Sequence, residues 1–438
     1  MSTATTRGAT ATRGAPEGLP RLLAGYQPEG SMGLDDHLAL YGRPPWRGST
    51  RRGGPLIASL EAAGLRGKGG ASFPTARKMR TVAAHRNRAV VVANGSEGEP
   101  LSSKDRLLLT SLPHLILDGA ALAAEAVGAD EVIVGVDRGA HRALGNVTRA
   151  IAARNAVRLD PVMVRLVTLP ARYVAGEETA LVNLVNGGLA KPTFTPPRPF
   201  ERGVGRRPTL IQNIETLAHI ALIARFGADW FRELGTEDEP GSTLLTVSGA
   251  VHHSSVCEVA IGTPVADAVD AAGGTTQDIS AFLFGGYFGS WLSADAAWNL
   301  PLTNAALKSA GSALGTGVVY AFPAGHCGLI AAAQVARYMA GETAGQCGPC
   351  VYGLAAIAEA LGNLADGRNA RAMPARLHQL FDEVRGRGAC QFPDGVIRFV
   401  DTTLKVFDDE VRHHVARGRC LLTPPPPMPV PTSDGGWQ

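Results

Sequence analysis

The chain has 438 residues, which exceeds the usual size of one hydrophobic core and predicts two or three domains. Its net charge is only +3, without a dense basic run, and this argues against nucleic acid or an anionic membrane surface as a partner. No run of about 18 apolar residues could span a bilayer, and the mean hydropathy of +0.04 is ordinary for a soluble protein. The six cysteines are too sparse for a disulfide scaffold and no secretory signal is recognisable, so we expect a soluble, cytoplasmic protein without direct membrane insertion.

Residues 1–20 consist mainly of Thr, Ala, Gly and Arg without hydrophobic periodicity. This composition predicts a disordered N-terminus. Its Arg-containing, acid-poor character would also suit a transit peptide, although a loose terminus is the favoured interpretation.

A glycine-rich loop follows a short helix expected at Ile57–Ala63. The stretch from Gly64 to Lys78 begins with four glycines in seven positions, and a helix should start near Pro74. Glycine lets the backbone approach a ligand closely, and free N–H groups before a helix N-terminus attract phosphate. Taken alone, the pattern fits a glycine-rich surface turn equally well, because it matches no established phosphate-loop motif.

Buried strands expected at Ala89–Ala93 and Glu131–Val136 alternate with helices expected at Leu115–Val127 and His141–Arg154. Such alternation predicts a parallel sheet covered by helices. The first strand ends on the small and acidic residues 94–100, at the position where α/β sheets bind ligands.

Two further polar clusters lie at predicted helix starts. Residues 173–179 precede a helix at Ala180–Val185, and N-capping alone could explain their paired carboxylates. A stiff extended loop is expected at Pro192–Pro199, and a second polar cluster at 206–216 enters another helix.

These four segments, in this order and spacing, resemble the NADH-oxidising flavoprotein subunit of respiratory complex I. They are also similar to the diaphorase subunits of NAD-linked hydrogenases and formate dehydrogenases. The resemblance extends from about Leu56 to Leu404 and implies an FMN-binding parallel-sheet domain at 21–240, in which nicotinamide stacks on the flavin.

The resemblance also implies roles for individual residues. Gly67, Gly69 and Lys78 would meet the FMN phosphate, while Glu99 and Glu178 would approach the dinucleotide as catalytic residues and Phe73 would supply an aromatic contact. The remaining cofactor-binding residues would be Asn94, Ser96, Glu97, Gly98, Tyr173, Gly176, Glu177, Glu178, Thr179, Gln212 and Asn213.

The chain departs from the family pattern in two ways. Ser96 replaces a usual aspartate, and Gln212 begins a usual asparagine pair, so the hydrogen-bonding capacity for FMN is kept. On the dinucleotide side, Thr81 and Arg198 stand at aromatic positions and Thr195 at a common lysine position. The sequence therefore supports FMN more strongly than NADH.

After Gly249 the pattern changes. Strands expected at Ser242–Ser248 and Val256–Val259, and the segment Phe282–Gly289, resemble the small β-grasp (soluble-ligand-binding) domain of the same family, here assigned to 241–305. Cys257 alternates with apolar neighbours and is expected to be a buried structural thiol.

The C-terminal part is predicted to be a helical-bundle domain at 306–420, followed by a proline-rich tail at 421–438. Amphipathic spacing predicts four helices, at Ile330–Met339, Leu354–Leu364, Ala375–Val384 and Phe399–Val415.

A cysteine motif lies between the first two of these helices. By itself, Cys347-x-x-Cys350 could be a redox pair or half of a zinc site. With Cys390 it resembles the cluster-binding pattern of the family, whose first cysteine is replaced by Ala344. Three outcomes are open: a [4Fe–4S] cluster with three cysteines and another group, a cluster completed by Cys420, or no cluster.

The other candidates near this motif are weaker. We assign Cys420 as the fourth ligand, and a free cysteine at a frayed helix end is the alternative. Cys327 is expected to serve packing, and His326, His413 and His414 are weaker candidate ligands.

The sequence thus predicts an α/β protein of three parts with the activity of an NADH dehydrogenase or diaphorase. FMN, a [4Fe–4S] cluster and NAD(H) would be its cofactors and substrate. The partner would be an electron-accepting protein subunit or a ferredoxin, in a larger redox complex. The alternatives are a ferredoxin-linked flavoprotein that does not use NADH, and a scaffold subunit without catalytic activity.

Overall fold

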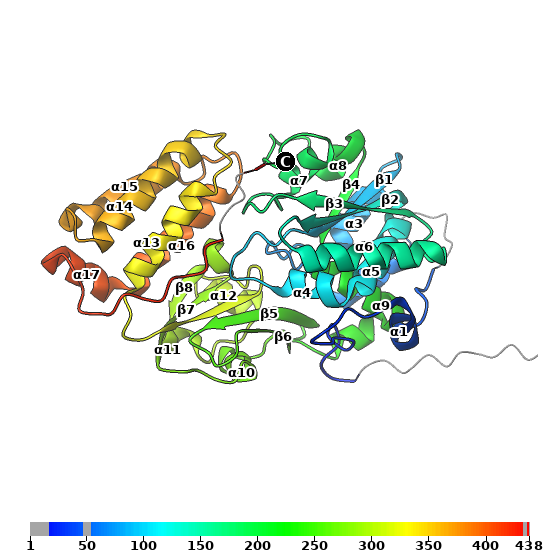
Figure 1. Ribbon diagram of the computed structural model, residues 1–438, viewed down its shortest axis with the longest axis horizontal. Helices are drawn as coiled ribbons and strands as arrows, with labels where there is room; N and C mark the ends of the chain where they lie inside the picture. The colour runs from blue at the N-terminus through cyan, green and yellow to red at the C-terminus, as the bar shows by residue number, and fades with distance from the viewer. Residues whose placement is uncertain (1–16, 47–53, 432–435, 438) are drawn as a thin grey trace, which may run out of the picture.

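The computed structural model describes residues 17–46, 54–431 and 436–437. Most of the predicted disordered N-terminus lies outside the described residues. Figure 1 shows a parallel-sheet part, a second sheet below it and a bundle of helices at the opposite end of the molecule.

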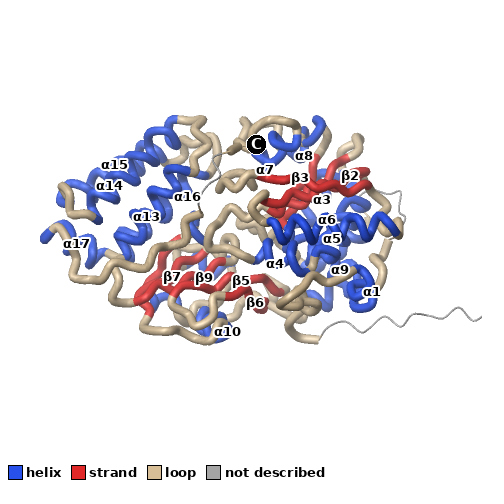
Figure 2. Tube along the Cα trace, in the orientation of Figure 1, coloured by secondary structure: helices blue, strands red, loops and turns tan. Residues whose placement is uncertain are grey.

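The first part contains a four-stranded parallel sheet in the order β3-β2-β1-β4, which confirms the predicted parallel sheet. Figure 2 shows the strands of this part in red with blue helices beside them. Its strands are β1 (Ala89–Gly95), β2 (Ala129–Asp137), β3 (Met163–Leu169) and β4 (Thr209–Asn213). The chain leaves β1 toward β2 on one side, while β4 lies on its other side, so the sheet has a switch point beside β1. The register pairs Asn94 with Asn213, which places the loops after β1 and β4 side by side.

Helices surround this sheet. Their sequence explains the packing, since α5 is apolar nearly all round and is buried along almost its whole length. The helices are α1 (Leu34–Tyr41), α2 (Pro55–Ala63), α3 (Thr75–Ala83), α4 (Lys104–Ser111), α5 (Pro113–Val127), α6 (His141–Ala156), α7 (Glu178–Val185), α8 (Pro199–Arg202) and α9 (Ile214–Arg232).

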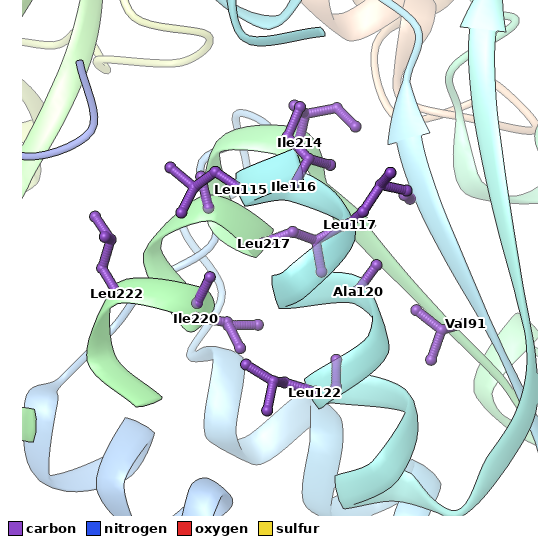
Figure 3. Packing of buried hydrophobic residues seen from close by; sticks show 14 of the residues in the cluster. Val91, Leu115, Ile116, Leu117, Ala120, Leu122, Ile214, Leu217, Ile220 and Leu222 are labelled. Atoms are coloured by element: carbon purple, nitrogen blue, oxygen red, sulfur yellow. The ribbon is translucent and has the colours of Figure 1, made fainter. Parts of the chain in front are cut away.

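The core of the first part is the contact between α5 and α9. Figure 3 shows Leu115 and Leu122 of α5 packed near Leu217 and Ile220 of α9. The two backbones approach so closely that a Cβ at position 119 would lie 1.8 Å from the carbonyl oxygen of residue 217. Only glycine fits at this position, and the contact holds α9 so that its N-terminus stays beside β4.

The second part is a mixed five-stranded sheet in the order β6-β5-β9-β7-β8, in which β5 and β9 are parallel. Its strands are β5 (Ser242–Gly249), β6 (Ser255–Ala260), β7 (Ile279–Phe284), β8 (Ser290–Ser293) and β9 (Val318–Pro323), and its helices are α10 (Val265–Ala271), α11 (Ala294–Ala297) and α12 (Asn304–Ser309). A hairpin, a helix and a central strand parallel to the first fit the predicted β-grasp arrangement. Because β9 lies in the middle of the sheet, this part extends to Pro323, and the predicted boundary at 305 is too early.

The third part is a helical bundle of α13 (Gly328–Gly341), α14 (Ala355–Ala365), α15 (Met373–Val384), α16 (Phe392–Val406) and α17 (Asp408–Arg417). The prediction of one helix over 399–415 is wrong, because the chain bends at Phe407, whose φ of −105° and ψ of 37° are not helical. The Phe407 ring is buried, with its centroid 5.3 Å from Trp291 and 5.5 Å from Phe322. Burying this ring against the second sheet therefore stabilises the chain more than continuing the helix through Phe407 would.

Among the described residues, no single helix combines the length and apolar composition needed to cross a membrane. In the part of the chain that the structure describes, one pair of helices, α4 and α5, meets the length and composition criteria when taken together, with a bend of 97° between the two helices.

Candidate functional site

The glycine-rich loop folds against the junction of β4 and α9. The N–H of Gly67 donates to the carbonyl of Phe73 at 2.9 Å and closes the loop. The N–H of Lys68 donates to Oγ1 of Thr216 at 2.9 Å, which ties the loop to the first turn of α9. A Cβ at Gly69 would lie 3.3 Å from Cβ of Asn213, so the loop backbone lies directly beside β4.

The predicted loops converge at the carboxyl end of the sheet. Nδ2 of Asn94 donates to the carbonyl of Gly176 at 2.8 Å. A Cβ at Gly176 would lie 2.9 Å from Cβ of Ser96, and a Cβ at Gly98 would lie 2.5 Å from the carbonyl oxygen of Tyr173. Glycine at both positions therefore lets the loop after β1 and the loop before α7 lie in direct contact.

Two predicted cofactor residues, Glu97 and Glu177, cap helices. Glu97 accepts hydrogen bonds from the Ser102 hydroxyl at 2.6 Å and the Asp105 N–H at 3.0 Å, at the start of α4. Glu177 is the N-cap of α7 and accepts from the backbone N–H groups of Thr179 and Ala180 at 2.9 and 3.0 Å. Both carboxylates satisfy helix N-termini and so position the loops.

Lys78 and Glu178 form an ion pair, although the sequence assigns them to different ligands. Their side chains are 21% and 45% exposed, so the pair opens to solvent and either partner can exchange it for a ligand. Phe73, which precedes α3, is 45% exposed, and the guanidinium of Arg77 lies 5.6 Å from its ring centroid.

The proline-rich loop carries an aromatic side chain that the sequence analysis missed. The N–H of Thr193 donates to Oγ1 of Thr179 at 2.8 Å, which fixes this loop at the start of α7. The next residue, Phe194, is 82% exposed. The signal for it was a single aromatic residue within the run of prolines.

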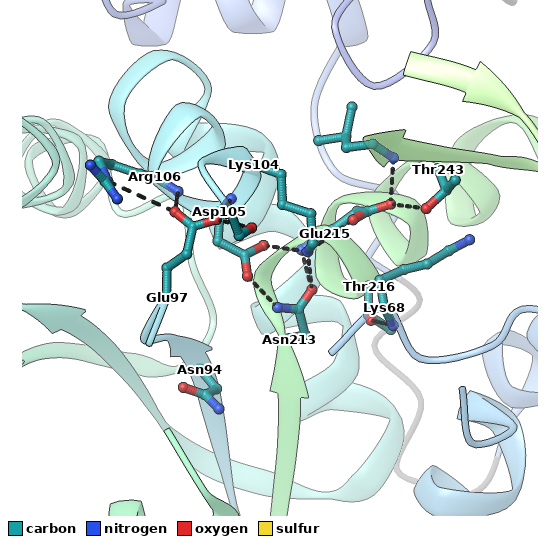
Figure 4. Close-up of polar contacts among 12 residues, drawn as sticks. Lys68, Asn94, Glu97, Lys104, Asp105, Arg106, Asn213, Glu215, Thr216 and Thr243 are labelled. Atoms are coloured by element: carbon teal, nitrogen blue, oxygen red, sulfur yellow. Dashed lines mark hydrogen bonds and ion pairs between the residues drawn. The ribbon is translucent and has the colours of Figure 1, made fainter. Parts of the chain in front are cut away.

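A buried ionic network lies beneath the glycine-rich loop (Figure 4). Lys104 is 2.9 Å from Asp105 and 3.0 Å from Glu215, and Nδ2 of Asn213 donates to Asp105 at 2.6 Å. Glu215 also accepts from the Thr243 hydroxyl at 3.0 Å, so the network joins α4 and α9 to β5. The Asn213 side chain is thus already engaged with protein.

The charges of this network support one another. Burial opposes the charge of Lys104, but Asp105 and Glu215 together raise its pKa above the ordinary value. Burial raises the pKa of Asp105 to about 6, against the effect of Lys104. Burial also opposes the charge of Glu215, yet Lys104 keeps the pKa of this carboxyl below its usual range. A pocket lined in part by Lys68, Lys104 and Glu215 lies between this network and the second sheet.

Glu99 is not at an open dinucleotide site. It is 4% exposed and accepts hydrogen bonds from the Tyr173 hydroxyl at 2.7 Å and the N–H groups of Tyr287 and Leu101 at 2.8 and 3.2 Å. Burial raises its pKa to about 7. This geometry shows a structural contact that the sequence did not predict: the carboxyl joins the loop after β1 to Tyr173 and to the second part of the molecule.

The loop before α7 also contacts both cysteine segments. The N–H of Tyr173 and the guanidinium of Arg172 bind the carboxylate of Glu342, each at 3.0 Å, five residues before Cys347. The Tyr173 ring centroid lies 5.7 Å from that of Phe392, two residues after Cys390. The predicted cofactor loops and the cysteine loops therefore form one contiguous contact.

Three of the four predicted metal ligands gather there. The N–H of Cys350 donates to the carbonyl of Cys347 at 3.1 Å, and a π-helical turn at Pro349–Leu354 leads into α14. Cys350 is buried in the core of the helical part, and Cys347 and Cys390 pack against the same core. Burial raises the pKa of the Cys350 thiol to about 12. Ala344, at the position of the missing cysteine, is buried.

Cys420 is not the fourth ligand. Its Sγ lies within 4.8 Å of the Cys327 sulfur and of a ring nitrogen of His414. Cys327 stands at the start of α13, whereas Cys347 follows the end of that helix. The 14 residues of α13 rise about 21 Å, which separates the two cysteine groups. The chain turns back after α17, and this turn carries Cys420 away from the predicted cluster.

Comparison with known proteins agrees with this arrangement. Residues 60–222 match the Nuo51 FMN-binding domain, and residues 330–414 match the NADH-ubiquinone oxidoreductase-F iron-sulfur binding region. The F subunit of NADH-quinone oxidoreductase from Mycobacterium tuberculosis is 31% identical over 385 residues, which cover 84% of this chain and 86% of the relative. The chain belongs to the family of NADH-quinone oxidoreductase F subunits.

Another F subunit and a solved structure are also similar to this chain. The Streptomyces coelicolor F subunit is 29% identical over 380 residues, covering 84% of this chain and 85% of the relative. The crystal structure of an NAD+-reducing [NiFe]-hydrogenase in the H2-reduced state matches with a TM-score of 0.76 and 30% identity, over 82% of this chain. The match spans 62% of that hydrogenase chain.

Membership among the F subunits confirms the family and fold class predicted from the four motifs. It also confirms the prediction of an NADH dehydrogenase-type oxidoreductase with FMN and an iron–sulfur centre. The assignments of individual residues and of the soluble-ligand-binding type of the second sheet stay predictions.

Proposed function

We propose that this chain is the subunit through which electrons enter a redox complex, taking them from NADH at its first part and delivering them through its helical part. The observation that carries the proposal is the position of the loop at 172–179. It contacts the loop after β1 through Gly176 and the cysteine segments through Glu342 and Phe392. Electrons need not cross any intervening domain between the two sites.

The residues at the end of the first sheet fit FMN. Gly69 presents exposed backbone beside Asn213, and Lys78 is a cation that can exchange Glu178 for a phosphate. Nε2 of Gln212 is buried and has no hydrogen-bond partner among the described residues, so it is a donor available to a cofactor. When bound, FMN accepts a hydride and releases its electrons singly.

The exposed side chains around this cradle suit a dinucleotide. Phe73 and Phe194 offer apolar ring faces, which stack favourably on flat heterocycles. Glu178, once released by Lys78, can accept hydrogen bonds from a ribose or an amide. We therefore assign Glu178, not Glu99, to the dinucleotide.

The three neighbouring thiols of Cys347, Cys350 and Cys390 fit an iron–sulfur cluster whose fourth iron takes a ligand other than cysteine. An acidic or partner-supplied group could stand there in place of Ala344. The acceptor is proposed to be a protein subunit of the same complex, in the cytoplasm. A ferredoxin is the alternative partner.

The test compares two glycine variants in anaerobically purified protein. Gly98→Ala should abolish most FMN binding, because its Cβ would meet the Tyr173 carbonyl, whereas Gly139→Ala should retain it, because nothing lies within 4 Å of that Cβ. In the wild type, NADH should bleach the flavin absorption. A wild type that binds no FMN would refute the proposal, and bleaching by dithionite but by neither NADH nor NADPH would favour another electron donor.

A further inference from the structure

A second group of metal-binding side chains lies outside the proposed electron route. One atom each from Cys327, His414 and Cys420 lies within 4.8 Å of the other two. Cys327 and His414 are 0% and 2% exposed, and Cys420 is half-buried. These residues come from the start of α13, from α17 and from the segment after α17, so the fold brings together ligands that are far apart in sequence.

The spacing of these atoms suits a tetrahedral ion. Sγ of Cys327 lies 3.5 Å from Nε2 of His414. Two ligands on one tetrahedral zinc, with Zn–S of about 2.3 Å and Zn–N of about 2.05 Å, are about 3.6 Å apart. Zinc accepts this mixture of thiolate and imidazole, and the half-buried side of Cys420 leaves room for water as the fourth ligand.

The backbone holds the three ligands in place without a metal. The N–H of Cys327 donates to the carbonyl of Thr423 at 3.0 Å, and the N–H of Thr423 donates to the carbonyl of Gly325 at 3.0 Å. Gly418, with φ of 73°, ends α17 in the left-handed region, and its N–H donates to the carbonyl of His414 at 2.9 Å. The turn at Gly418 brings Cys420 back toward Cys327.

The orientation of His414 also suits ligation. Its Nε2 faces Cys327, while Nδ1 is buried and makes no hydrogen bond of regular geometry among the described residues. The backbone carbonyls of Leu364 and Ala365 lie beside the ring as acceptors. A proton on Nδ1 directed at these carbonyls leaves the Nε2 lone pair for a metal, as is usual for histidine ligands.

We propose that Cys327, His414 and Cys420 bind a structural zinc ion that fastens the C-terminal tail to the helical bundle. Beyond Cys420 the tail crosses back over the molecule (Figure 1), where Met428 is buried and the Tyr287 hydroxyl donates to the carbonyl of Pro429 at 2.6 Å. The ion joins α13, α17 and the tail at one point. It serves stability and stands apart from the iron–sulfur ligands.

The test measures zinc and iron by mass spectrometry of the elements in the full chain, purified anaerobically. Wild type should hold one zinc per chain, and Cys420→Ser and His414→Gln should each lose most of that zinc, because each removes a direct ligand. Two matched controls, Cys257→Ser and His413→Gln, should keep the zinc. Cys347→Ser should lose iron and keep zinc, which separates this site from the cluster.

Cobalt provides a second readout that does not depend on how well a variant purifies. Titration of the metal-depleted wild type with Co2+ should give thiolate-to-cobalt charge-transfer absorption and tetrahedral bands, both absent from Cys420→Ser with an unchanged circular dichroism spectrum. Zinc content equal in wild type and Cys420→Ser, or zinc lost only with Cys347→Ser, would overturn the proposal. A Cys327–Cys420 disulfide in the anaerobic wild type, seen as a loss of two hydrogens in its mass, would also overturn it.

Discussion

Removal of the Glu342 carboxylate tests the contact between the proposed FMN loop and the cysteine loop. Glu342 is 4% exposed and binds the Arg172 guanidinium and the Tyr173 N–H, each at 3.0 Å. Breaking a buried ion pair from one side costs about 3–5 kcal/mol. The Arg172 side chain is 11% exposed, and without Glu342 its guanidinium would still lie 4.8 Å from the Trp437 ring centroid. We therefore expect Glu342→Ala to lower the free energy of unfolding by about 3 kcal/mol, near the lower end of that range.

Urea unfolding of wild type and variants, followed by circular dichroism, measures this loss. Glu342→Gln keeps an acceptor for the Tyr173 N–H and should lose only about 1–2 kcal/mol. Glu383→Ala is the matched control, since Glu383 and Arg376 are 50% and 44% exposed at 3.9 Å, and it should cost under about 1 kcal/mol. Equal midpoints for Glu342→Ala and Glu383→Ala would refute the reasoning. Glu342→Ala should also slow electron passage from flavin to acceptor in stopped-flow measurements.

Further predictions concern single residues of the site. Lys78→Ala should weaken FMN by about 1.5–3 kcal/mol, the cost of a charge-assisted bond to phosphate; an unchanged FMN dissociation constant would place Lys78 elsewhere. Burial raises the pKa of Glu99 from 4.5 to about 7, so on raising the pH the unfolded chain releases this proton before the folded chain does. Between these two pKa values the free energy of unfolding of wild type should fall by about 3 kcal/mol relative to that of Glu99→Gln. The same difference in unfolding free energy at pH 4 and pH 8 would contradict this. Ala344→Cys should raise iron retention in air, because Cys420 is too far away to complete the cluster; unchanged iron content would count against the assigned ligands. Phe194→Ala should raise the KM for NADH with little change in kcat, by the roughly 0.5–1.5 kcal/mol of an aromatic contact, and an unaltered KM would remove Phe194 from the site.

The local elements followed well from sequence because each depends on neighbouring residues. The alternation of apolar strands and helices gave the four-stranded sheet, and the glycine and acidic motifs identified the loops at its end. The prediction of one helix from 399 to 415 was wrong because the apolar periodicity of the sequence continues through Phe407. In the structure the Phe407 ring packs against Trp291 and Phe322, which are distant in sequence. No local pattern encodes that contact.

The sequence by itself determined the family, and it predicted the loops of the cofactor site and three cysteines for the cluster, since these are short motifs whose chemistry depends on residue type and spacing. Only the tertiary structure decided which side chains are free to act. Glu99 is enclosed by Tyr173 and Tyr287, while Lys78 and Glu178 meet across two separate helices. The tertiary structure also places Cys420 beside Cys327 and His414 instead of in the predicted cluster. The direction that a chain takes after a helix depends on long-range packing, which a linear pattern does not contain.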